Sequence, residues 1–587
     1  MITLKVTRTD YPRPSLRRDE WLSLNGEWEF AFDDERKGDS EKWYLADTPF
    51  DRKIHVPFAY QCALSGIGDS SFHDVVWYRK VIEIPKAWEG RRVVLHFGAV
   101  DYLARVWVNG QLAAIHEGGH TPFHADISDL LTDDVNFITV RAEDDSKNLA
   151  QPRGKQYWEE RSASIFYTRT TGIWQSVWLE PVSPVHLKKI KYKPDIDRND
   201  IEIRSFLNDV PAGQEVWLNV KINFDGATVT EERFKIIGRE ETRTIRLHDY
   251  NDHGLGRWWT PERPNLYDVR FELTVNGVTV DECESYFGMR KVSIENGKFN
   301  LNNRPYFMRM VLDQGYFPDG NLTPPSEEAI IRDITLTKAM GFNGVRKHQK
   351  TEDPLFLYEC DRQGLLVWGE CANAYVYSEE YVQRFTREWH EIVERDYNHP
   401  CIVAWVPLNE SWGVPNIQID ARQQQHALAM YHLIKSLDDT RLVIGNDGWE
   451  MLKTDLVCIH DYEWREEVLS RRYATADTAI QAMPANRRIL VGNTRYEGQP
   501  ILVTEFGGIS FRKSDWEGWG YSGASDEEDF INRLKAVFRP LNLSPVVQGF
   551  CYTQLTDVEQ EINGLLTYER VPKVPIETIR KIVCGEI

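Results

Sequence analysis

Beyond residue 295, apolar runs of strand length alternate with amphipathic helical segments, and this alternation constrains the fold more than any other feature of the chain. Segments 326–340 and 526–538, for example, have helical periodicity and lie between apolar runs. The eight apolar runs are 305–311, 341–348, 365–370, 402–410, 441–448, 455–462, 501–508 and 546–554. Strands separated by helices form parallel β/α units, and eight of them fit a (β/α)8, or TIM, barrel of typically about 250 residues. We therefore predict an α/β TIM barrel in this half of the chain.

The first 290 residues have a different pattern, with short alternating strands and frequent turns but little helical periodicity, which is typical of β-sandwiches. The run at 102–116 alternates, and it contains Asn109-Gly110, a strong hairpin signal. A Pro-flanked break near residues 180–186 separates these strands from a second set. The predicted domains are therefore an all-β module at 1–183, a second all-β module at 184–290 and the barrel at 291–587.

The acidic composition narrows the class of partner. The 587 residues include 90 Asp and Glu against 70 Lys and Arg, which gives a formal net charge of −20. Nucleic-acid binding needs clustered positive charge, and an anionic membrane surface repels such a chain. The sequence also contains 20 Trp and 25 Tyr, whose flat apolar faces and polar groups suit sugar rings. We therefore expect a small neutral ligand, with no nucleic acid and no membrane.

The cysteine pattern points to a reducing compartment. The eight cysteines are scattered without a CxxC pair, and Cys458 and Cys551 lie in apolar runs. This arrangement is typical of buried reduced thiols rather than of a disulfide framework or a zinc site. No apolar leader opens the chain, and no run reaches transmembrane length. The expected location is cytoplasmic.

Two glutamates end predicted barrel strands, Glu410 the fourth and Glu505 the seventh. The catalytic groups of a TIM barrel lie at the C-terminal ends of its strands. Either glutamate alone could be a solvated strand end, but a pair from two strands is the minimum apparatus for glycoside hydrolysis. One carboxylic acid protonates the departing oxygen, while the other carboxylate attacks the anomeric carbon.

These residues also resemble a known family. Asn409-Glu410 in PLNES and Glu505 in TEFGG resemble the acid/base and nucleophile motifs of glycoside hydrolase family 2, which includes β-galactosidases, β-glucuronidases, β-mannosidases and some arabinosidases. Further stretches that resemble the family are 11–30, 97–127, 258–269, 341–348 and 361–370. The resemblance implies a jelly-roll-like sugar-binding sandwich, then an immunoglobulin-like sandwich, then the catalytic barrel.

The resemblance assigns roles to five residues. Glu410 would be the general acid/base and Glu505 the nucleophile of a retaining double displacement. Asn409 would bind the 2-hydroxyl of the sugar, Arg346 would orient the nucleophile, and Tyr462 would donate a hydrogen bond to it. The arginine also makes physical sense, since an adjacent guanidinium lowers a carboxylate pKa by about 1–3 units. Its alternative role is a structural ion pair.

Other polar residues near predicted strand ends are candidates for sugar binding, because each sugar hydroxyl needs a donor or an acceptor. Asp313 follows the first strand, His348 ends the second, and His460 lies in the sixth. A lone histidine such as His460 is as often a satisfied core residue. Trp516, in a Gly-rich loop after the seventh strand, could form a stacking wall or a lid, or could simply pack its own loop. Comparable positions are those of Gln314, Gln349, Asp447, Trp449, Trp519, Gln554 and Asp557.

Departures from the family's patterns bear on the substrate. The family's galactosidases often have Arg-Thr-Ser-His where this chain has RKHQ at 346–349. Some members also have a magnesium-binding Glu and His where this chain reads ECANAYVY at 370–377, and the sequence shows no cluster of metal ligands there. We therefore expect no metal and no cofactor. The glucuronidases bind the sugar carboxylate through an Asn-x-Lys clamp, but the triplet Asn296-Gly297-Lys298 of this chain comes before the barrel begins, so the clamp is missing from the barrel. This favours a neutral, galactose-like glycone.

The predicted function is that of a retaining exo-glycosidase that hydrolyses terminal neutral sugars, with β-galactosides favoured. The alternatives on the same scaffold are an α-L-arabinofuranosidase or arabinopyranosidase and a β-glucuronidase. A different class, a non-catalytic carbohydrate-binding protein, would need neither a nucleophile nor its orienting arginine. The expected partner is a small oligosaccharide or glycoside, and the chain could form a homo-oligomer.

Overall fold

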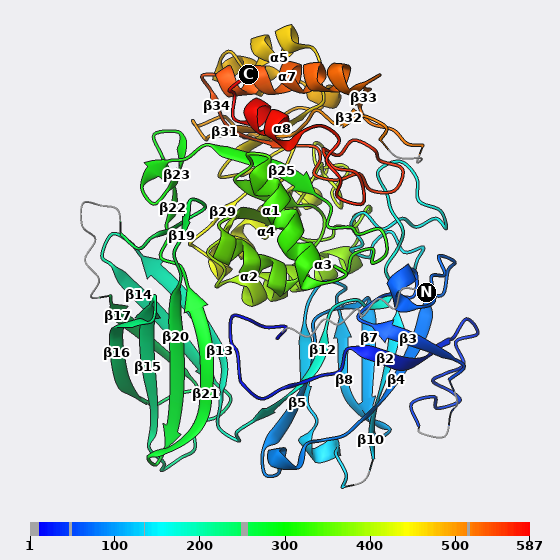
Figure 1. Ribbon diagram of the computed structural model, residues 1–587, viewed down its shortest axis with the longest axis vertical. Coiled ribbons are helices and arrows are strands. Elements are labelled where there is room, and N and C mark those ends of the chain that lie inside the picture. Colours follow the sequence, from blue (N-terminus) through cyan, green and yellow to red (C-terminus); the bar gives the residue numbers. More distant parts are fainter. Residues whose placement is uncertain (1–10, 46–47, 49, 134, 248–255, 514–516) are drawn as a thin grey trace.

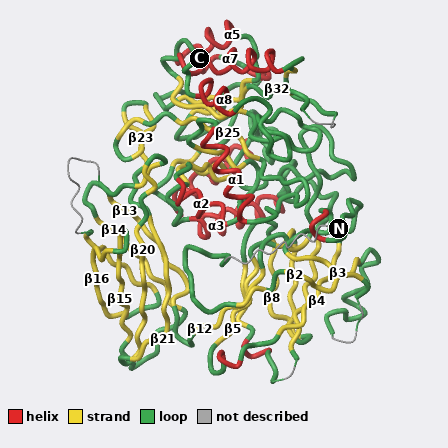
Figure 2. Tube along the Cα trace, viewed as in Figure 1, coloured by secondary structure: helices red, strands yellow, loops and turns green. Residues whose placement is uncertain are grey.

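The computed structural model describes residues 11–587 except 46–47, 49, 134, 248–255 and 514–516. Two all-β bodies lie side by side beneath a body of mixed helices and strands (Figure 1). Helices are concentrated in the upper body, whereas the two lower bodies consist mainly of strands (Figure 2). The prediction of two β-sandwiches followed by a TIM barrel is confirmed.

The first sandwich pairs a six-stranded antiparallel sheet, in the order β3-β2-β4-β10-β7-β8, with a four-stranded sheet, β1-β12-β5-β9. A short pair, β6 and β11, lies beside them. The strands are β1 (Leu22–Ser23), β2 (Gly26–Phe32), β3 (Arg52–Val56), β4 (Val75–Ile82), β5 (Arg92–Phe97), β6 (Val100–Asp101), β7 (Leu103–Val108), β8 (Gln111–Glu117), β9 (Phe123–Asp126), β10 (Asn136–Glu143), β11 (Gly172–Ile173) and β12 (Val177–Val182). Their inward side chains, such as Trp28 and Leu95, form one core. Asn109 and Gly110 both have positive φ in the β7–β8 turn, as the hairpin signal predicts.

The second sandwich pairs a three-stranded sheet, β13-β14-β17, with a four-stranded sheet, β16-β15-β20-β21. The strands are β13 (Leu187–Asp195), β14 (Asp200–Leu207), β15 (Val216–Phe224), β16 (Ala227–Ile236), β17 (Glu240–Arg246), β20 (Tyr267–Val275) and β21 (Val278–Phe287). Strand β15 alternates buried and partly exposed residues, so the apolar face packs on its own core, which includes Leu218 and Phe271. Two small sheets lead towards the barrel: β18 (Trp259–Thr260) with β19 (Arg263–Pro264), and β22 (Val292–Glu295) with β23 (Lys298–Leu301) and β24 (Arg304–Pro305).

The barrel contains eight parallel strands in the order β29-β28-β27-β26-β25-β34-β31-β30. They are β25 (Met308–Asp313), β26 (Gly344–Lys347), β27 (Leu366–Glu370), β28 (Ile402–Val406), β29 (Leu442–Val443), β30 (Val457–Asp461), β31 (Ile501–Phe506) and β34 (Val547–Tyr552). Each coincides with one of the eight apolar runs. The Asp455 N–H bonds the Val443 carbonyl at 2.9 Å and the His460 N–H bonds the Gly448 carbonyl at 3.3 Å. These bonds connect β29 and β30, the two end strands, through the residues that flank them.

Helices connect most of these strands and cover the barrel. They are α1 (Glu327–Ala339), α2 (Pro354–Gln363), α3 (Glu379–Asp396), α4 (Ala421–Leu437), α5 (Glu466–Arg472), α6 (Ala476–Gln481), α7 (Glu527–Leu543) and α8 (Ile576–Val583). Ser326 and Ser378 cap α1 and α3 through their side chains, which satisfies a free backbone N–H group in each first turn. Residues 444–456, all of them described, contain no helix, so the β29–β30 connection departs from the regular alternation. A short pair, β32 (Ile509–Ser510) and β33 (Ser522–Gly523), follows β31. No helix among the described residues is both long and apolar enough to cross a lipid bilayer.

The first sandwich reaches the C-terminal end of the barrel through its 144–170 connection, which joins β10 to β11. The Arg153 and Gly154 N–H groups bond the Asn373 carbonyl, which follows β27, at 3.1 and 2.9 Å. The Tyr167 hydroxyl donates to Glu561, which follows β34, at 2.5 Å. This connection therefore lies among the loops that follow the barrel strands, the part of a TIM barrel that carries the chemistry.

Candidate active site

Arg346, at the end of β26, is the centre of the site. Its side chain is fully buried and donates to Glu505 Oε1 at 2.9 Å and to Asn409 Oδ1 at 2.6 Å. It also forms ion pairs with Asp447 Oδ2 at 2.8 Å and with Glu370. Burial alone would lower the pKa of Arg346, but these three carboxylates outweigh it and raise the pKa. A permanent cation thus holds together the ends of several barrel strands.

Glu505, near the end of β31, is held at both carboxylate oxygens. Arg346 donates to Oε1, and the Tyr462 hydroxyl donates to Oε2 at 2.6 Å. Burial, followed by the charge of Glu505, raises the pKa of Tyr462 well above its usual value, so the hydroxyl keeps its proton and remains a donor. The ring of Tyr521 stacks on the ring of Tyr462, with the two ring centroids 3.4 Å apart. A carboxylate fixed in this way has one orientation.

Glu410 lies four residues beyond β28, in a turn rather than in the strand itself. Its φ is +51°, and its N–H bonds the Asp447 carbonyl at 2.9 Å. Its side chain is 20% exposed, compared with 7% for Glu505. A carboxylate oxygen of Glu410 and one of Glu505 lie within 4.8 Å of each other. The short separation of about 5–5.5 Å is typical of retaining glycosidases, whereas inverting enzymes need about 6.5–9.5 Å.

His460, in β30, lies between the two glutamates. Its Nδ1 is 2.8 Å from Glu410 Oε1 and 3.5 Å from Glu505 Oε2, and its Nε2 is 3.5 Å from Asp447 Oδ1. Burial alone would lower the pKa of His460, but Glu505 and Asp447 outweigh it and raise the pKa to about 10. The imidazole therefore carries a positive charge at neutral pH and bridges the two carboxylates. It is neither a solvated surface residue nor an apolar core histidine.

Three further residues were predicted from the sequence to bind the sugar: His348, Asp313 and Trp516. His348 belongs to the site, with its Nδ1 3.0 Å from Glu370 and 3.2 Å from Arg346. Asp313 has both carboxylate oxygens engaged within the protein, because they accept from Lys347 at 2.7 Å and from the Gly315 N–H at 2.8 Å. Its expected role in sugar binding is therefore not supported by its contacts. Trp516 lies outside the described residues.

Sequence reasoning missed Glu370 and underrated Asp447. Glu370 ends the third apolar run, so the rule that selected Glu410 and Glu505 could have found it. Asp447 was noted only as one of several polar residues after the fifth run, yet it forms an ion pair with Arg346 at 2.8 Å and accepts a hydrogen bond from Thr504 Oγ1 at 2.6 Å. Both carboxylates balance the charge of the buried guanidinium.

An aromatic cluster next to Glu410 was also missed. It consists of Trp158 and Phe166 from the first sandwich with Tyr375 and Trp412 from the barrel, and neighbouring ring centroids are 4.6 to 6.0 Å apart. All four side chains are only partly buried. No local signal predicts the cluster, because its two halves are more than 200 positions apart in the sequence. Flat aromatic faces at this position can stack on a sugar or aryl group.

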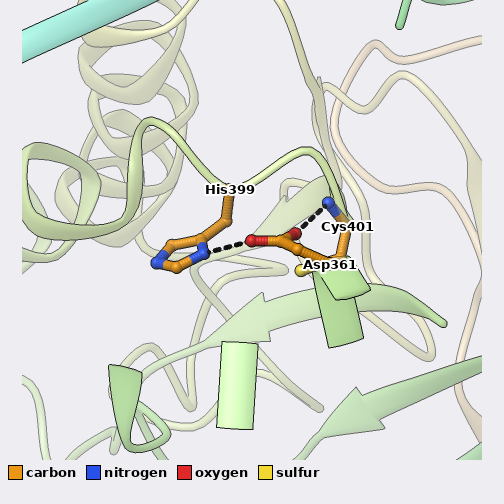
Figure 3. Close-up of side chains that lie close together, drawn as sticks. All are labelled: Asp361, His399 and Cys401. Carbon is orange, nitrogen blue, oxygen red and sulfur yellow. Dashed lines mark hydrogen bonds and ion pairs between the residues drawn. The ribbon is translucent and has the colours of Figure 1, made fainter. Parts of the chain in front are cut away.

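Two groups of possible metal ligands also come together among the described residues, although the sequence shows neither as a local cluster. In the first, Glu410 and Glu505 with His460, the histidine is a charged donor and has no lone pair for a metal. The second is Asp361, His399 and Cys401 (Figure 3). There the carboxylate accepts from His399 Nδ1 at 2.6 Å, from the Tyr286 hydroxyl at 2.8 Å and from the Cys401 N–H at 2.9 Å.

Burial raises the pKa of the Cys401 thiol well above its usual value, and the thiol donates to the Leu357 carbonyl at 3.5 Å. Metal binding needs the thiolate. Because Tyr286 belongs to β21 and Asp361 to α2, this second group links the second sandwich to the barrel. Its donors are engaged in structural hydrogen bonds, which do not fit a metal site.

Comparison with known proteins identifies the family. Three family models match successive parts of the chain: the sugar binding domain of glycosyl hydrolases family 2 at 21–180, a second family 2 domain at 185–290 and the family 2 TIM barrel domain at 292–511. A β-galactosidase of Thermoanaerobacter pseudethanolicus is 29% identical over 410 residues, which are 67% of this chain and 51% of that protein. A β-glucuronidase of Streptococcus agalactiae is 24% identical over 543 residues, which are 85% of this chain and 84% of that protein.

Among solved structures, a β-glucuronidase of Ruminococcus gnavus has a TM-score of 0.77 at 20% identity, covering 98% of this chain and 99% of that one. This likeness concerns the fold. The chain spans about half the length of the β-galactosidase and 40% of the length of a putative β-glucuronidase of Formosa agariphila, to which it is 28% identical. The family models cover most of the chain in the order expected from the sequence, and the chain belongs to glycoside hydrolase family 2.

Proposed function

We propose that the chain is a retaining exo-glycosidase in which Glu505 is the nucleophile and Glu410 the general acid/base. The observation that carries this proposal is the approach of their carboxylate oxygens to within 4.8 Å, which favours a covalent intermediate over direct attack by water. The surroundings support the division of roles. Glu505 is fixed by Arg346 and Tyr462, as an attacking carboxylate should be, whereas Glu410 is the more exposed of the two.

In the first step, a carboxylate oxygen of Glu505 attacks the anomeric carbon, and the bond from that carbon to the leaving oxygen breaks. Glu410 gives its proton to that oxygen. Glu410 Oε1 faces His460, while Oε2 has no hydrogen-bond donor among the described residues, so Oε2 is the oxygen available to the glycosidic bond. In the second step, Glu410 takes a proton from water, whose oxygen attacks the anomeric carbon and releases Glu505.

Arg346 donates a hydrogen bond to Asn409 Oδ1 at 2.6 Å. Because the same guanidinium also donates to Glu505, it orients the Asn409 amide relative to the nucleophile. The amide N–H group can then donate to the 2-hydroxyl, a contact that strengthens in the transition state of such enzymes. The same arrangement argues against a non-catalytic sugar-binding protein. Such a protein gains nothing from holding a carboxylate at both oxygens.

The glycone has two candidates. A neutral, β-galactoside-type glycone is supported by the lack of an Asn-x-Lys triplet after residue 300. A β-glucuronide is supported by Lys155, a buried lysine at the same end of the barrel, and several relatives are named β-glucuronidases. A panel of 4-nitrophenyl glycosides, followed by ¹H NMR of the first-formed sugar, tests the proposal. Retained configuration supports it, and an inverted product or no turnover of any glycoside contradicts it.

A further inference from the structure

Lys155 is placed at the C-terminal end of the barrel by the first sandwich. The preceding residue, Gly154, has a φ of +59°, and a Cβ there would lie 2.5 Å from the Gln349 carbonyl oxygen. This close approach, with the bonds to Asn373, fixes the backbone on the barrel. The Lys155 carbonyl in turn accepts from the Tyr167 N–H at 2.8 Å. The backbone at Lys155 is thus held on both sides by hydrogen bonds.

The ammonium group lies among groups from three barrel strands. Its Nζ is 5.2 Å from the centre of the Trp412 ring, two residues beyond Glu410. Burial lowers the pKa of His348, and the charges of Arg346 and Lys155 lower it further. Burial raises the pKa of Glu561, against the opposing charge of Lys155. Lys155 therefore faces the loops that follow β26, β28 and β34.

The lysine is only 8% exposed, yet no described residue forms a hydrogen bond or an ion pair with its Nζ. Glu561 interacts electrostatically with Lys155, but both of its carboxylate oxygens already accept hydrogen bonds from other residues. The Tyr167 hydroxyl donates to Oε2 at 2.5 Å, and Asn563 Nδ2 donates to Oε1 at 3.0 Å. Buried charges are normally paired. A cation held in a catalytic site without a partner is suited to a charge that arrives with the ligand.

We propose that Lys155 binds a carboxylate of the substrate and so selects acidic glycosides. This inference rests on the proposed glycosidase function and goes beyond it. The carboxylate has two possible sources: a uronic acid glycone, on the side of His348 and Glu561, or an acidic leaving group, on the side of Trp412. A hydroxyl could satisfy one of the three N–H groups, but only an anion also neutralises the charge.

If the carboxylate belongs to the glycone, the expectation of a neutral glycone is wrong. That expectation came from the lack of an Asn-x-Lys triplet in the barrel sequence. A cation can reach the same site from a different module, however, and Lys155 precedes the barrel by more than 100 residues. The charge of the site must therefore be judged from the fold, not from the barrel segment alone.

The test compares acidic and neutral substrates in matched pairs. The glycone pairs are 4-nitrophenyl β-D-glucuronide with the β-D-glucoside, and the β-D-galacturonide with the β-D-galactoside. The leaving-group pair is 3-carboxyphenyl with phenyl β-D-galactoside. Each is measured with wild type, Lys155→Met, Lys155→Arg and a control, Lys147→Met. Lys147 lies in the same connection, but its ammonium bonds Glu159 and the Trp158 carbonyl at the surface.

We expect Lys155→Met to lower kcat/KM for the acidic member of one pair by about 100-fold, mainly through KM, because it removes one partner of a buried charge pair. The neutral member should change less than about 3-fold, within the range of neutral contacts around a binding hot spot. Lys155→Arg should recover most of the activity, and Lys147→Met should match wild type. The pair that responds identifies the source of the carboxylate. Equal losses on acidic and neutral members would overturn the inference.

A binding measurement separates this inference from the proposed function. Free D-glucuronate, D-galacturonate and D-galactose are titrated into Glu505→Gln while Trp fluorescence is followed. If the carboxylate belongs to the glycone, a uronate should bind at least 10-fold more tightly than galactose, and adding Lys155→Met should remove the difference. For that source, uronate binding that ignores Lys155 overturns the inference even if the enzyme is active. Lys155-dependent uronate binding with no turnover of any glycoside supports the inference and rejects the proposed function.

Discussion

The charged histidine between the two glutamates predicts a pH dependence of stability. In the folded protein Glu505 and Asp447 overcome the effect of burial and raise the pKa of His460 from 6.5 to about 10. In the unfolded chain the pKa returns to about 6.5. A group whose pKa is raised by folding stabilises the folded state fully below its unfolded pKa. It loses this contribution as the pH rises through the folded pKa. The window is therefore pH 6.5 to 10.

The size of the effect follows from the two pKa values. A pKa difference between 6.5 and about 10 corresponds to about 5 kcal/mol at 1.36 kcal/mol per unit. At a few degrees per kcal/mol for a domain of this size, the contribution is on the order of 10 °C in the unfolding midpoint. Replacing the histidine by glutamine keeps a neutral hydrogen-bonding group but removes the titration.

The assay is the thermal unfolding midpoint of wild type, His460→Gln and a control, His390→Gln, at pH 6.5, 8 and 9.5. His390 is exposed on α3. We expect wild type and the control to lose stability in parallel as the pH rises. The His460→Gln midpoint should start lower and fall by less, so that the curves converge near pH 10. If the His460→Gln curve runs parallel to that of wild type, the imidazole is not charged in the folded protein and the reasoning is wrong.

Three further outcomes are expected. Arg346→Met should lower the free energy of unfolding by about 3–5 kcal/mol in urea, because Glu370, Asp447 and Glu505 would lose a shared buried cation; unchanged stability would contradict this. Tyr462→Phe should lower kcat by about 10-fold with little change in KM, since one hydrogen bond to the nucleophile is worth about 1.4 kcal/mol; an effect on KM alone would place Tyr462 in substrate binding. Activity should survive exhaustive dialysis against EDTA, because the donors of both candidate ligand groups are already engaged; loss of activity that magnesium restores would contradict it.

The barrel and its two glutamates could be predicted because the relevant signals are local. An apolar run that ends in a carboxylate predicts a buried strand with an acidic end, and this prediction depends only on residues that are neighbours in the sequence. The rule located Glu410 and Glu505, and it also applies to Glu370. Strand lengths were less predictable. The run at 441–448 forms a strand only at Leu442–Val443, because the Asn446 side chain bonds Ser411 and the Trp449 carbonyl instead of continuing the sheet.

Non-local features could not be predicted in this way. Nothing near Lys155 or Phe166 in the sequence shows that the 144–170 connection would lie on the barrel, because that placement depends on residues more than 200 positions away, such as Asn373 and Glu561. The charge of His460 likewise depends on Glu505 and Asp447, which come from other strands. The domain boundaries 1–183, 184–290 and 291–587 stay predictions.

The central claim is that Glu505 forms the glycosyl bond while Glu410 transfers the proton, and the configuration of azide products tests it most directly. An activated β-glycoside that wild type hydrolyses is incubated with azide and either Glu505→Ala or Glu410→Ala, and the product is analysed by ¹H NMR. Without the nucleophile, azide attacks from the vacated face, so Glu505→Ala should give the α-glycosyl azide. Without the acid/base, azide attacks the glycosyl-enzyme, so Glu410→Ala should give the β-glycosyl azide. The opposite pairing would exchange the two roles, and full activity in both variants would contradict the account.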